Sequence, residues 1–155
     1  MFNGILQTFL ISMLPLIELR LGIPFGYARF DLHILLASIV ATLGTILSVA
    51  ILLRCLPIII KLSLKVSFLK KILEKVFEKT RAKHSEKLIH LGEIALVIFV
   101  AVPIPGSGGW GGALIAYLFG LSYWKALKFI SIGLVFAALI VALLTVGIDK
   151  IIQLF

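Results

Sequence analysis

The sequence has little charge, and that scarcity excludes most classes of soluble protein. Only 14% of its 155 residues are charged, whereas 61% are hydrophobic. A soluble domain has about 25% charged and roughly 45–50% apolar residues, because most of its surface has to be polar. The single cysteine, Cys55, excludes an internal disulfide. We therefore expect a membrane protein rather than a soluble enzyme, a disordered chain or a disulfide-stabilised scaffold.

Long uncharged runs predict helices that cross a bilayer. Residues 32–53, 94–124 and 129–148 contain no charged side chain and hold 22, 31 and 20 residues. Each run reaches the ~20 residues that a helix needs to span the hydrocarbon core. Residues 1–17 are also uncharged and lack the basic start and cleavage site of a signal peptide, so we expect them in the mature protein. The runs predict a multi-pass protein of the cytoplasmic (inner) membrane.

Two of the apolar regions carry too much proline and glycine for a straight helix. Residues 15–26 hold two prolines and two glycines, and residues 103–112 hold two prolines and five glycines. Irregular backbone inside a bilayer is tolerated only where it is buried in protein or lines a wet cavity. We therefore predict two re-entrant helical hairpins with turns near the midplane. Each precedes one plain crossing helix, over 32–53 and roughly 126–148, with Asp31 as the N-cap of the first.

The positive charge is concentrated in one segment between apolar regions. Residues 61–90 carry nine Lys or Arg and three Glu, which accounts for +6 of the formal net charge of +8. Under the positive-inside rule this segment faces the cytoplasm, and we do not expect nucleic acid as a partner. Its apolar residues recur mostly at spacings of three and four, which predicts a basic amphipathic helix on the membrane surface, or alternatively a solvated helix packed on a partner. They are Leu62, Val66, Leu69, Leu73, Val76 and Phe77.

The two ends of the chain have the same order of predicted elements. Residues 1–53 and 92–155 each contain a broken hairpin followed by one crossing helix, and the linker 54–91 joins them within a single membrane domain, 1–155. With the linker in the cytoplasm, the first crossing helix runs inward and the second runs outward. We therefore predict an all-α integral membrane protein of two inverted repeats. Broken segments at corresponding places in two such halves indicate a transport site.

Glu18 and Arg20 are the ionisable residues predicted to lie inside the membrane. At the centre of an isolated transmembrane helix each costs roughly 2.5–3.5 kcal/mol, so such residues are a functional hypothesis by default. The alternative is structural: the two side chains pair and lock the broken segment. We place both on a substrate or proton path between the hairpins, together with Pro24, Pro103, Pro105, Gly106, Ser107, Gly108, Gly109 and Trp110.

Two other motifs have simpler explanations. Residues 106–111 match G-x-G-x-x-G, but a dinucleotide site needs a preceding strand and an acidic residue about twenty positions further on. No acidic residue occurs between Glu93 and Asp149. His84 and His90 have no set of cysteines or carboxylates at ligand spacing around them. We therefore expect no cofactor, no metal site and no enzymatic activity.

The two broken segments resemble the signatures of a known family. The first reads Pro-Leu-Ile-Glu-Leu-Arg over 15–20 and Gly-Ile-Pro-Phe-Gly over 22–26. The second reads Val-Pro-Ile-Pro-Gly-Ser-Gly-Gly-Trp over 102–110 and Gly-Ala-Leu-Ile over 112–115. Together they resemble the small multi-drug export protein family over nearly the whole chain. The arrangement is also distantly similar to the DedA superfamily, whose members carry opposed re-entrant hairpins with a membrane-embedded carboxylate and arginines and are linked to lipid-carrier translocation.

The resemblance implies a small membrane exporter whose substrate path lies between the hairpins. A proton is the expected coupling ion, because Glu18 is the one acidic residue predicted in the membrane core. Two alternatives stay open: a translocase or scramblase of an anionic lipid or lipid-phosphate carrier, in which Arg20 would hold the head group, and a structural membrane subunit without a substrate. Expected partners are membrane lipids, a small-molecule or lipid substrate and, because four short membrane elements enclose little volume, a second copy of the chain as a homodimer.

Overall fold

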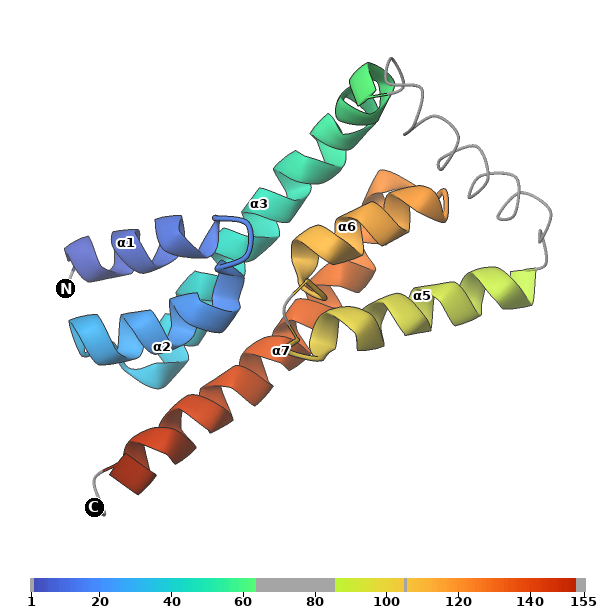
Figure 1. The fold of residues 1–155 in the computed structure, drawn as a ribbon. Helices are drawn as coiled ribbons and strands as arrows, with labels where there is room; N and C mark the ends of the chain where they lie inside the picture. Colours follow the sequence, from blue (N-terminus) through green and yellow to red (C-terminus); the bar gives the residue numbers. More distant parts are fainter. Residues whose placement is uncertain (1, 64–85, 105, 153–155) are drawn as a thin grey trace.

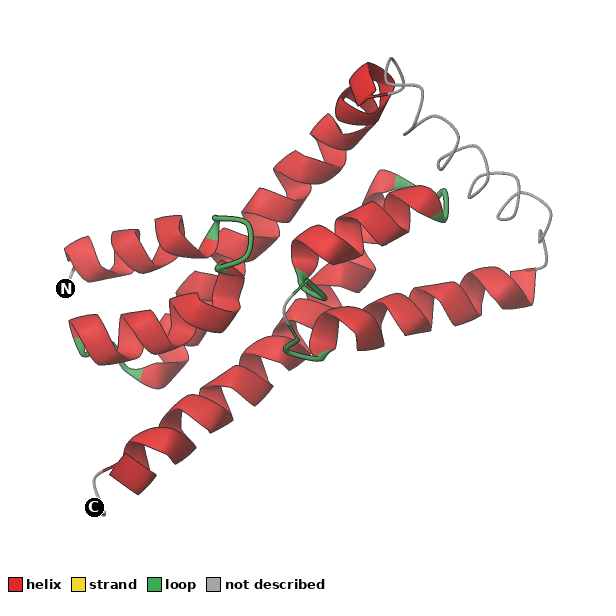
Figure 2. Cartoon of the chain, in the orientation of Figure 1, coloured by secondary structure: helices red, strands yellow, loops and turns green. Residues whose placement is uncertain are grey.

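The chain is helical wherever its structure is described. The computed structural model describes residues 2–63, 86–104 and 106–152, and every regular element in these ranges is an α-helix (Figures 1 and 2). The all-α prediction is confirmed for these residues. Most of the predicted amphipathic helix lies outside them. The helices are α1 (Phe2–Ser12), α2 (Glu18–Phe30), α3 (Ile34–Ser63), α5 (Glu86–Ala101), α6 (Gly109–Leu118) and α7 (Tyr123–Ile152).

Each half of the chain contains a helical hairpin and one long helix. The hairpin of α1 and α2 packs on α3, and the hairpin of α5 and α6 packs on α7. The halves also exchange contacts, because α2 touches α7 and α6 touches α3. In Figure 1 the turn of each hairpin lies in the middle of the molecule, and the start of α1 and the end of α7 lie at the same end.

The turn of the first hairpin is made without glycine. Between α1 and α2, Leu16 and Glu18 have φ angles of 75° and 46°, in the left-handed region that L-residues other than glycine seldom adopt. Helix α2 then continues through Pro24, so the prediction that both prolines break the helix is wrong at this position. A proline inside a helix costs about 3 kcal/mol. The same helix packs closely on its neighbours, because Gly26 lies so near α1 and α3 that an added Cβ would touch Thr8 and Ala37.

The turn of the second hairpin follows its proline and glycine content. Helix α5 ends at Ala101, just before Val102, whose helical conformation is disfavoured by the proline that follows it. Gly106 has a φ of 88°, which a side chain would strain. At Gly111 an added Cβ would collide with the carbonyl oxygen of Gly106. The loop therefore needs glycine both for its backbone angles and for its close approach to the start of α6.

The two long helices begin differently from the prediction. Helices α3 and α7 each hold 30 residues, so both extend beyond the ranges expected from the sequence. Asp31 is not the N-cap of α3: it has a φ of 50° and closes the end of α2. His33 occupies the place before α3, where its Nδ1 accepts a hydrogen bond of 3.3 Å from the N–H of Leu35. The left-handed Asp31 redirects the chain too early for its carboxylate to cap the next helix.

The packed core lies where α3, α6 and α7 meet. Val49, Leu52 and Leu56 of α3 are buried there with Ala113 and Ala116 of α6. The two helices approach closely, because an added Cβ at Gly109 would lie 2.5 Å from Cγ2 of Val49. Small residues on α6 therefore bring its backbone against α3.

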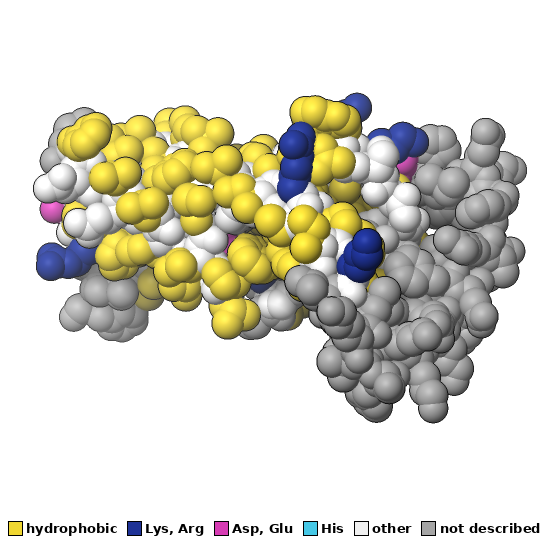
Figure 3. All heavy atoms as spheres, turned by 90° about the horizontal axis from the view of Figure 1, so that it is seen from above, with side chains coloured by type: hydrophobic (Ala, Val, Ile, Leu, Met, Phe, Trp, Pro, Cys, Tyr) yellow, Lys and Arg dark blue, Asp and Glu magenta, His cyan; other side chains and the backbone are white. Residues whose placement is uncertain are grey.

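The outer surface is strongly apolar. A row of large apolar residues along α3, spaced by four, is 44–65% exposed: Leu35, Ile39, Leu43, Leu47 and Ile51. Figure 3 shows hydrophobic side chains covering much of one face. Soluble monomers rarely expose apolar patches of more than a few hundred Å². Within the described residues, the stretches Ile34–Lys61 and Tyr123–Ile151 are long and apolar enough to cross a bilayer. Length, composition and surface together indicate a membrane protein.

Candidate functional site

The Glu18 side chain binds the N-terminus of α6. Its carboxylate accepts hydrogen bonds from the backbone N–H of Gly109, at 3.2 Å from Oε2, and of Trp110, at 3.0 Å from Oε1. Glu18 is only 4% exposed. The first N–H groups of a helix have no partner inside it, and the helix dipole makes this end positive. The carboxylate of the first hairpin therefore caps the second hairpin.

The Arg20 side chain binds the other end of the same turn. Its Nη2 donates to the carbonyl oxygen of Val102 and to Oγ of Ser107, both at 3.0 Å, and Nη1 donates to the carbonyl oxygen of Ile104. These carbonyls follow α5, where the helix dipole is negative and carbonyl groups lack helical partners. The guanidinium thus adds charged donors to carbonyls that also accept hydrogen bonds from within the loop.

Ser107 connects this loop internally. Its Oγ lies 2.7 Å from the carbonyl oxygen of Val102 and 2.8 Å from that of Ile104. The hydroxyl has one proton, so it donates to one carbonyl at a time while accepting from Arg20. Ser107 and Arg20 thus add side-chain donors to two carbonyls that also accept backbone hydrogen bonds, Val102 from the N–H of Ile104 at 2.8 Å and Ile104 from the N–H of Ser107 at 3.1 Å.

Glu18 and Arg20 form no ion pair with each other in the described structure. The sequence left open whether they pair, and the contacts above give them separate partners on the two sides of the second turn. A regular helix separates side chains two positions apart. The left-handed backbone conformation of Glu18 further turns its side chain away from the side chain of Arg20.

The other predicted site residues lie around this contact, with one outside the described residues. An added Cβ at Gly108 would overlap the carboxylate of Glu18, so glycine is needed here for close approach. The main chain of Trp110 binds Glu18, whereas its indole Nε1 is buried without an acceptor in the described residues. Pro24 and Pro103 line a neighbouring groove. Pro105 lies outside the residues that the structure describes.

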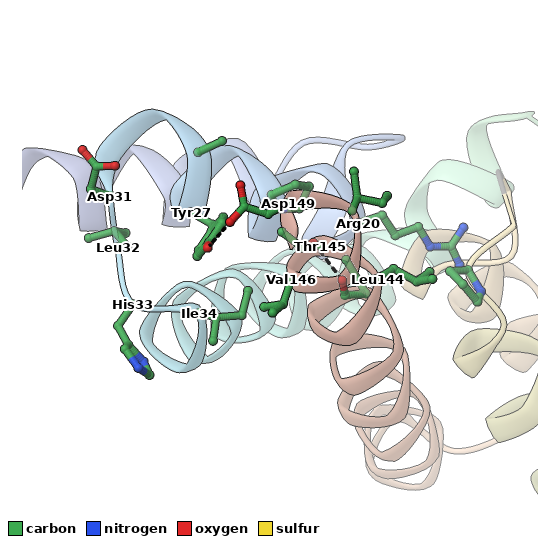
Figure 4. A pocket seen from close by; sticks show the side chains of 15 residues that line it. Arg20, Tyr27, Asp31, Leu32, His33, Ile34, Leu144, Thr145, Val146 and Asp149 are labelled. Atoms are coloured by element: carbon green, nitrogen blue, oxygen red, sulfur yellow. Dashed lines mark hydrogen bonds between the residues drawn. The ribbon is translucent and has the colours of Figure 1, made fainter. Parts of the chain in front are cut away.

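A groove of about 990 Å³ runs between α2 and α7 and ends at the hairpin contact. Arg20 and Pro103 line its inner end, and Asp31 and His33 line the opposite end, as Figure 4 shows for the labelled residues. Between them the hydroxyl of Tyr27 donates a 2.8 Å hydrogen bond to Oδ2 of Asp149, which joins α2 to α7. The remaining wall is mostly apolar. Glu18 does not line this groove.

The family comparison covers the chain from the start of α2 through the second hairpin turn and most of α7. The sequence model of the family described as "Putative small multi-drug export protein" matches residues 18–140, which include Glu18, Arg20 and the loop they bind. The chain belongs to this family. No curated protein and no solved structure matches the chain. Membership supports a membrane transporter of the export type, in agreement with the two long apolar helices.

The sequence analysis did not identify several polar residues that form contacts in this exporter-family protein. Tyr27 and Asp149 are 122 positions apart, and no local pattern predicts their contact. Glu93 is a second buried carboxylate, with Nζ of Lys125 at 3.6 Å from its Oε1. Its place directly before an uncharged run is a signal that could have identified it. Among the described residues, no three His, Cys, Asp or Glu side chains form a group that could hold a metal ion.

Proposed function

We propose that this chain is a small exporter of the inner membrane whose substrate path follows the α2–α7 groove to the contact between the hairpin turns. The observation that carries the proposal is the position of the groove, which ends on Arg20 and Pro103 beside that contact. A cavity that reaches the contact between the hairpin turns, with the partly buried Arg20 in its wall, is suited to bind a substrate near the midplane.

The order of elements supports two inverted repeats. Each half has two short helices before a 30-residue helix, and the cross-contacts α2–α7 and α6–α3 are reciprocal. We place residues 61–90 in the cytoplasm, so that α3 runs inward, α7 runs outward and both hairpins re-enter from opposite sides. The groove then opens to the outside. Its counterpart between α6 and α3 is filled by the packed core, which closes the path toward the cytoplasm.

The gate of this exporter is the contact between the two turns. Substrate can pass only if Glu18 leaves the N–H groups of α6 and Arg20 leaves the carbonyls that follow α5. Such a change exchanges charge-assisted hydrogen bonds, which are about twice as strong as neutral ones. The gate therefore stays closed unless a ligand or a proton replaces one of these bonds.

A proton bound to Glu18 is our proposed trigger. The neutral acid is a weaker acceptor than the carboxylate, and it loses the attraction to the positive end of α6. Protonation would thus loosen one side of the gate while Arg20 still holds the other. A pH gradient across the membrane then changes how often the turns separate.

The test is flux in proteoliposomes with an imposed pH gradient. A cationic dye and a fluorescent phospholipid, measured in separate experiments, distinguish export of small molecules from lipid movement. Glu18→Gln should abolish gradient-driven flux while leaving the purified protein monodisperse and helical, because the amide resembles the neutral acid. Glu93→Gln, at a buried carboxylate away from the turns, is the matched control and should retain flux. Unchanged flux in Glu18→Gln would defeat the proton trigger, and flux of neither probe in the wild type would favour a structural subunit.

The orientation is tested separately by cysteine labelling in a Cys55→Ser background. A cysteine at Asn3 should react with an impermeant maleimide added outside intact cells, and one at Ser85 should react only after the membrane is opened. Labelling of Ser85→Cys in intact cells contradicts the inverted repeat with a cytoplasmic linker.

A further inference from the structure

Helix α1 has one face turned toward the protein and one face turned away from it. The inner face packs on α2 and α3 (Figure 1), and its residues are buried: Gly4, Thr8 and Ser12. The outer face is exposed at positions spaced by three and four: Asn3, Leu6, Gln7 and Leu10. Two of these four side chains end in an amide. This face therefore differs from the exposed row along α3, whose apolar side chains are matched by acyl chains alone.

The position of α1 against α3 places the Gln7 side chain at the depth of the apolar bilayer core. Helix α3 is long and apolar enough to cross the membrane, and its middle falls at Ser48 and Val49. An added Cβ at Gly44 would lie 2.5 Å from the carbonyl oxygen of Phe9, so these two residues are level. Gly44 is about 7 Å from the middle of α3, and Gln7 is two residues beyond Phe9, or about 3 Å. Gln7 is therefore at most about 10 Å from the midplane, whereas half of the hydrocarbon core measures about 15 Å.

The amide of Gln7 has no partner within the described residues. Its side chain is exposed and forms no hydrogen bond to any of them. It does not line the α2–α7 groove, so that groove brings it no water. An amide moved from water into an apolar medium loses hydrogen bonds, and its burial there is unfavourable until it finds a new partner. The partner of Gln7 therefore has to come from the lipid or from another chain.

A second copy of the chain meets these conditions. Every copy inserts in the same orientation, so its Gln7 lies at the same depth. An amide has both a donor and an acceptor, so two amides related by a two-fold axis each donate to the other. Asn3, Gln7 and Leu10 also have the four–three spacing at which parallel helices pair. A lipid head group would have to descend into the core to reach Gln7, and a different protein would need a polar group at this one depth.

From this geometry we infer that the chain forms a homodimer through the outer faces of two parallel α1 helices, with Gln7 hydrogen-bonded to Gln7 of the second copy. The sequence predicts a homodimer without placing its interface. Leu6 and Leu10, which are 47% and 51% exposed, pack around the amide pair. No residue that lines the α2–α7 groove belongs to α1, so the contact leaves the groove of each copy accessible. The inference concerns assembly and is independent of the proposed export path.

The first experiment counts subunits in lipid. Cys55 is exposed and is the single cysteine, so a maleimide dye marks each chain once. The labelled protein is reconstituted in phosphatidylcholine vesicles over a series of protein-to-lipid ratios, and the bleaching steps per vesicle give the dimer dissociation constant. Gln7→Leu replaces the amide by an apolar group of similar size. We expect it to raise the dissociation constant about tenfold, because each of the two interhelical hydrogen bonds contributes a factor of about three.

Leu43→Ala is the matched control for this measurement. Leu43 is 54% exposed and adjoins Gly44 on α3, so it faces lipid at nearly the depth of Gln7 but on a different helix. Its substitution should leave the dissociation constant unchanged. Circular dichroism should show the same helical content in the wild type and both variants, because the two side chains are exposed.

The second experiment locates the interface while Gln7 is retained. In a Cys55→Ser background, Leu10→Cys and Leu43→Cys replace side chains of nearly equal exposure on α1 and α3. A two-fold axis between parallel helices places equivalent residues opposite each other. Oxidation with copper phenanthroline in membranes should therefore link Leu10→Cys into disulfide dimers at least tenfold faster than Leu43→Cys. Adding Gln7→Leu should slow the linkage of Leu10→Cys.

Three outcomes overturn the inference. A wild type that stays monomeric at the highest protein-to-lipid ratio excludes the dimer. An unchanged dissociation constant in Gln7→Leu would mean that head groups or water satisfy the amide. Equal rates of linkage for Leu10→Cys and Leu43→Cys would place the contact between copies on another face of the molecule.

Discussion

The two hairpin turns contact each other inside an apolar molecule, but the first contributes charged side chains and the second contributes backbone groups. The first turn has charged side chains, Glu18 and Arg20, and left-handed backbone angles at residues that are not glycine. The second turn has no charged side chain and presents its own N–H and carbonyl groups across five glycines. The first turn therefore depends on which side chains are present, and the second depends on which are absent.

The difference teaches how charge is kept inside an apolar molecule. Each charge of the first turn faces the helix end of opposite polarity in the second: the carboxylate meets the start of α6 and the guanidinium meets the end of α5. Neither charge needs a charged partner. Substitutions in the first turn should therefore act by removing charge or backbone strain, and those in the second by adding bulk or removing a hydrogen bond. Four substitutions test this difference, from the largest expected change in stability to the smallest.

Adding a side chain to the second turn should have the largest effect. Gly108→Val displaces the Glu18 carboxylate from the N–H groups of Gly109 and Trp110 and leaves it buried. Removing the partner of a buried charge costs about 3–5 kcal/mol. We expect that loss in the free energy of unfolding, measured by titration with sodium dodecyl sulfate. Gly147→Val, where an added Cβ meets nothing within 4 Å, is the control and should cost less than about 1 kcal/mol. Similar losses for the two variants would show that the close approach of Gly108 to Glu18 does not determine stability.

Removing the cation of the first turn should have the next largest effect. Arg20→Gln leaves the carbonyls of Val102 and Ile104 without a charged donor. Hydrogen bonds to charged groups contribute about 1.5–3 kcal/mol, and we expect a loss of about 2–3 kcal/mol in the same titration. Arg29→Gln, at an exposed position in the last turn of α2, should change stability by less than about 0.5 kcal/mol. If the two arginines prove equally dispensable, the guanidinium does not hold the loop.

Removing the hydroxyl of the second turn should have a smaller effect. Ser107→Ala loses one neutral donor to the carbonyls after α5 and one acceptor of Arg20, while Arg20 keeps its bonds to the carbonyls. The expected loss is about 1 kcal/mol. Ser38→Ala, whose hydroxyl bonds only within α3, should cost less than about 0.5 kcal/mol. A loss as large as that of Arg20→Gln would show that Ser107, rather than the guanidinium, organises the loop.

The smallest predicted change is a gain. Leu16 has a φ of 75° and is 85% exposed, so its backbone is strained while its side chain contributes little packing. Leu16→Gly removes a left-handed penalty of about 1–2 kcal/mol but adds flexibility to the unfolded chain, and a net gain of about 0.5–1 kcal/mol is expected. Leu14→Gly, at a neighbouring residue without a positive φ, should give no gain. Destabilisation by Leu16→Gly would mean that the turn in solution differs from the structure.

Much of the fold follows from sequence patterns that act locally. Uncharged runs long enough to cross a bilayer predict α3 and α7. Proline with glycine predicts one break within residues 15–26 and another within 103–112, and the structure places these breaks before Glu18 and after Ala101. Pro24 and Asp31 were assigned wrongly, because their conformations are decided by packing of α2 on α1 and α3 rather than by their own preferences. Local sequence signals locate the helices and turns, but they do not predict the conformations that depend on packing between helices.

The contact between the hairpin turns was predictable only as a set of residues, without its pairings. Glu18, Arg20 and the loop 103–112 were identified from the cost of charge and irregular backbone in a membrane. Which group each charge binds could not be predicted, because that depends on the left-handed Leu16 and Glu18, which no glycine marks. The Tyr27 to Asp149 contact joins residues brought together only when the two halves assemble.

The equal length of α3 and α7 ties this protein to the thickness of its bilayer. Thirty residues of α-helix measure about 45 Å, whereas the hydrocarbon core is about 30 Å thick. Both helices must therefore tilt or extend into the head-group region, and their tilt changes as acyl chains lengthen or shorten. Because each long helix carries one hairpin, we expect a change of tilt to shift the two turns relative to each other. A change in lipid chain length should then alter the hydrogen bonds between the turns at the centre of the molecule.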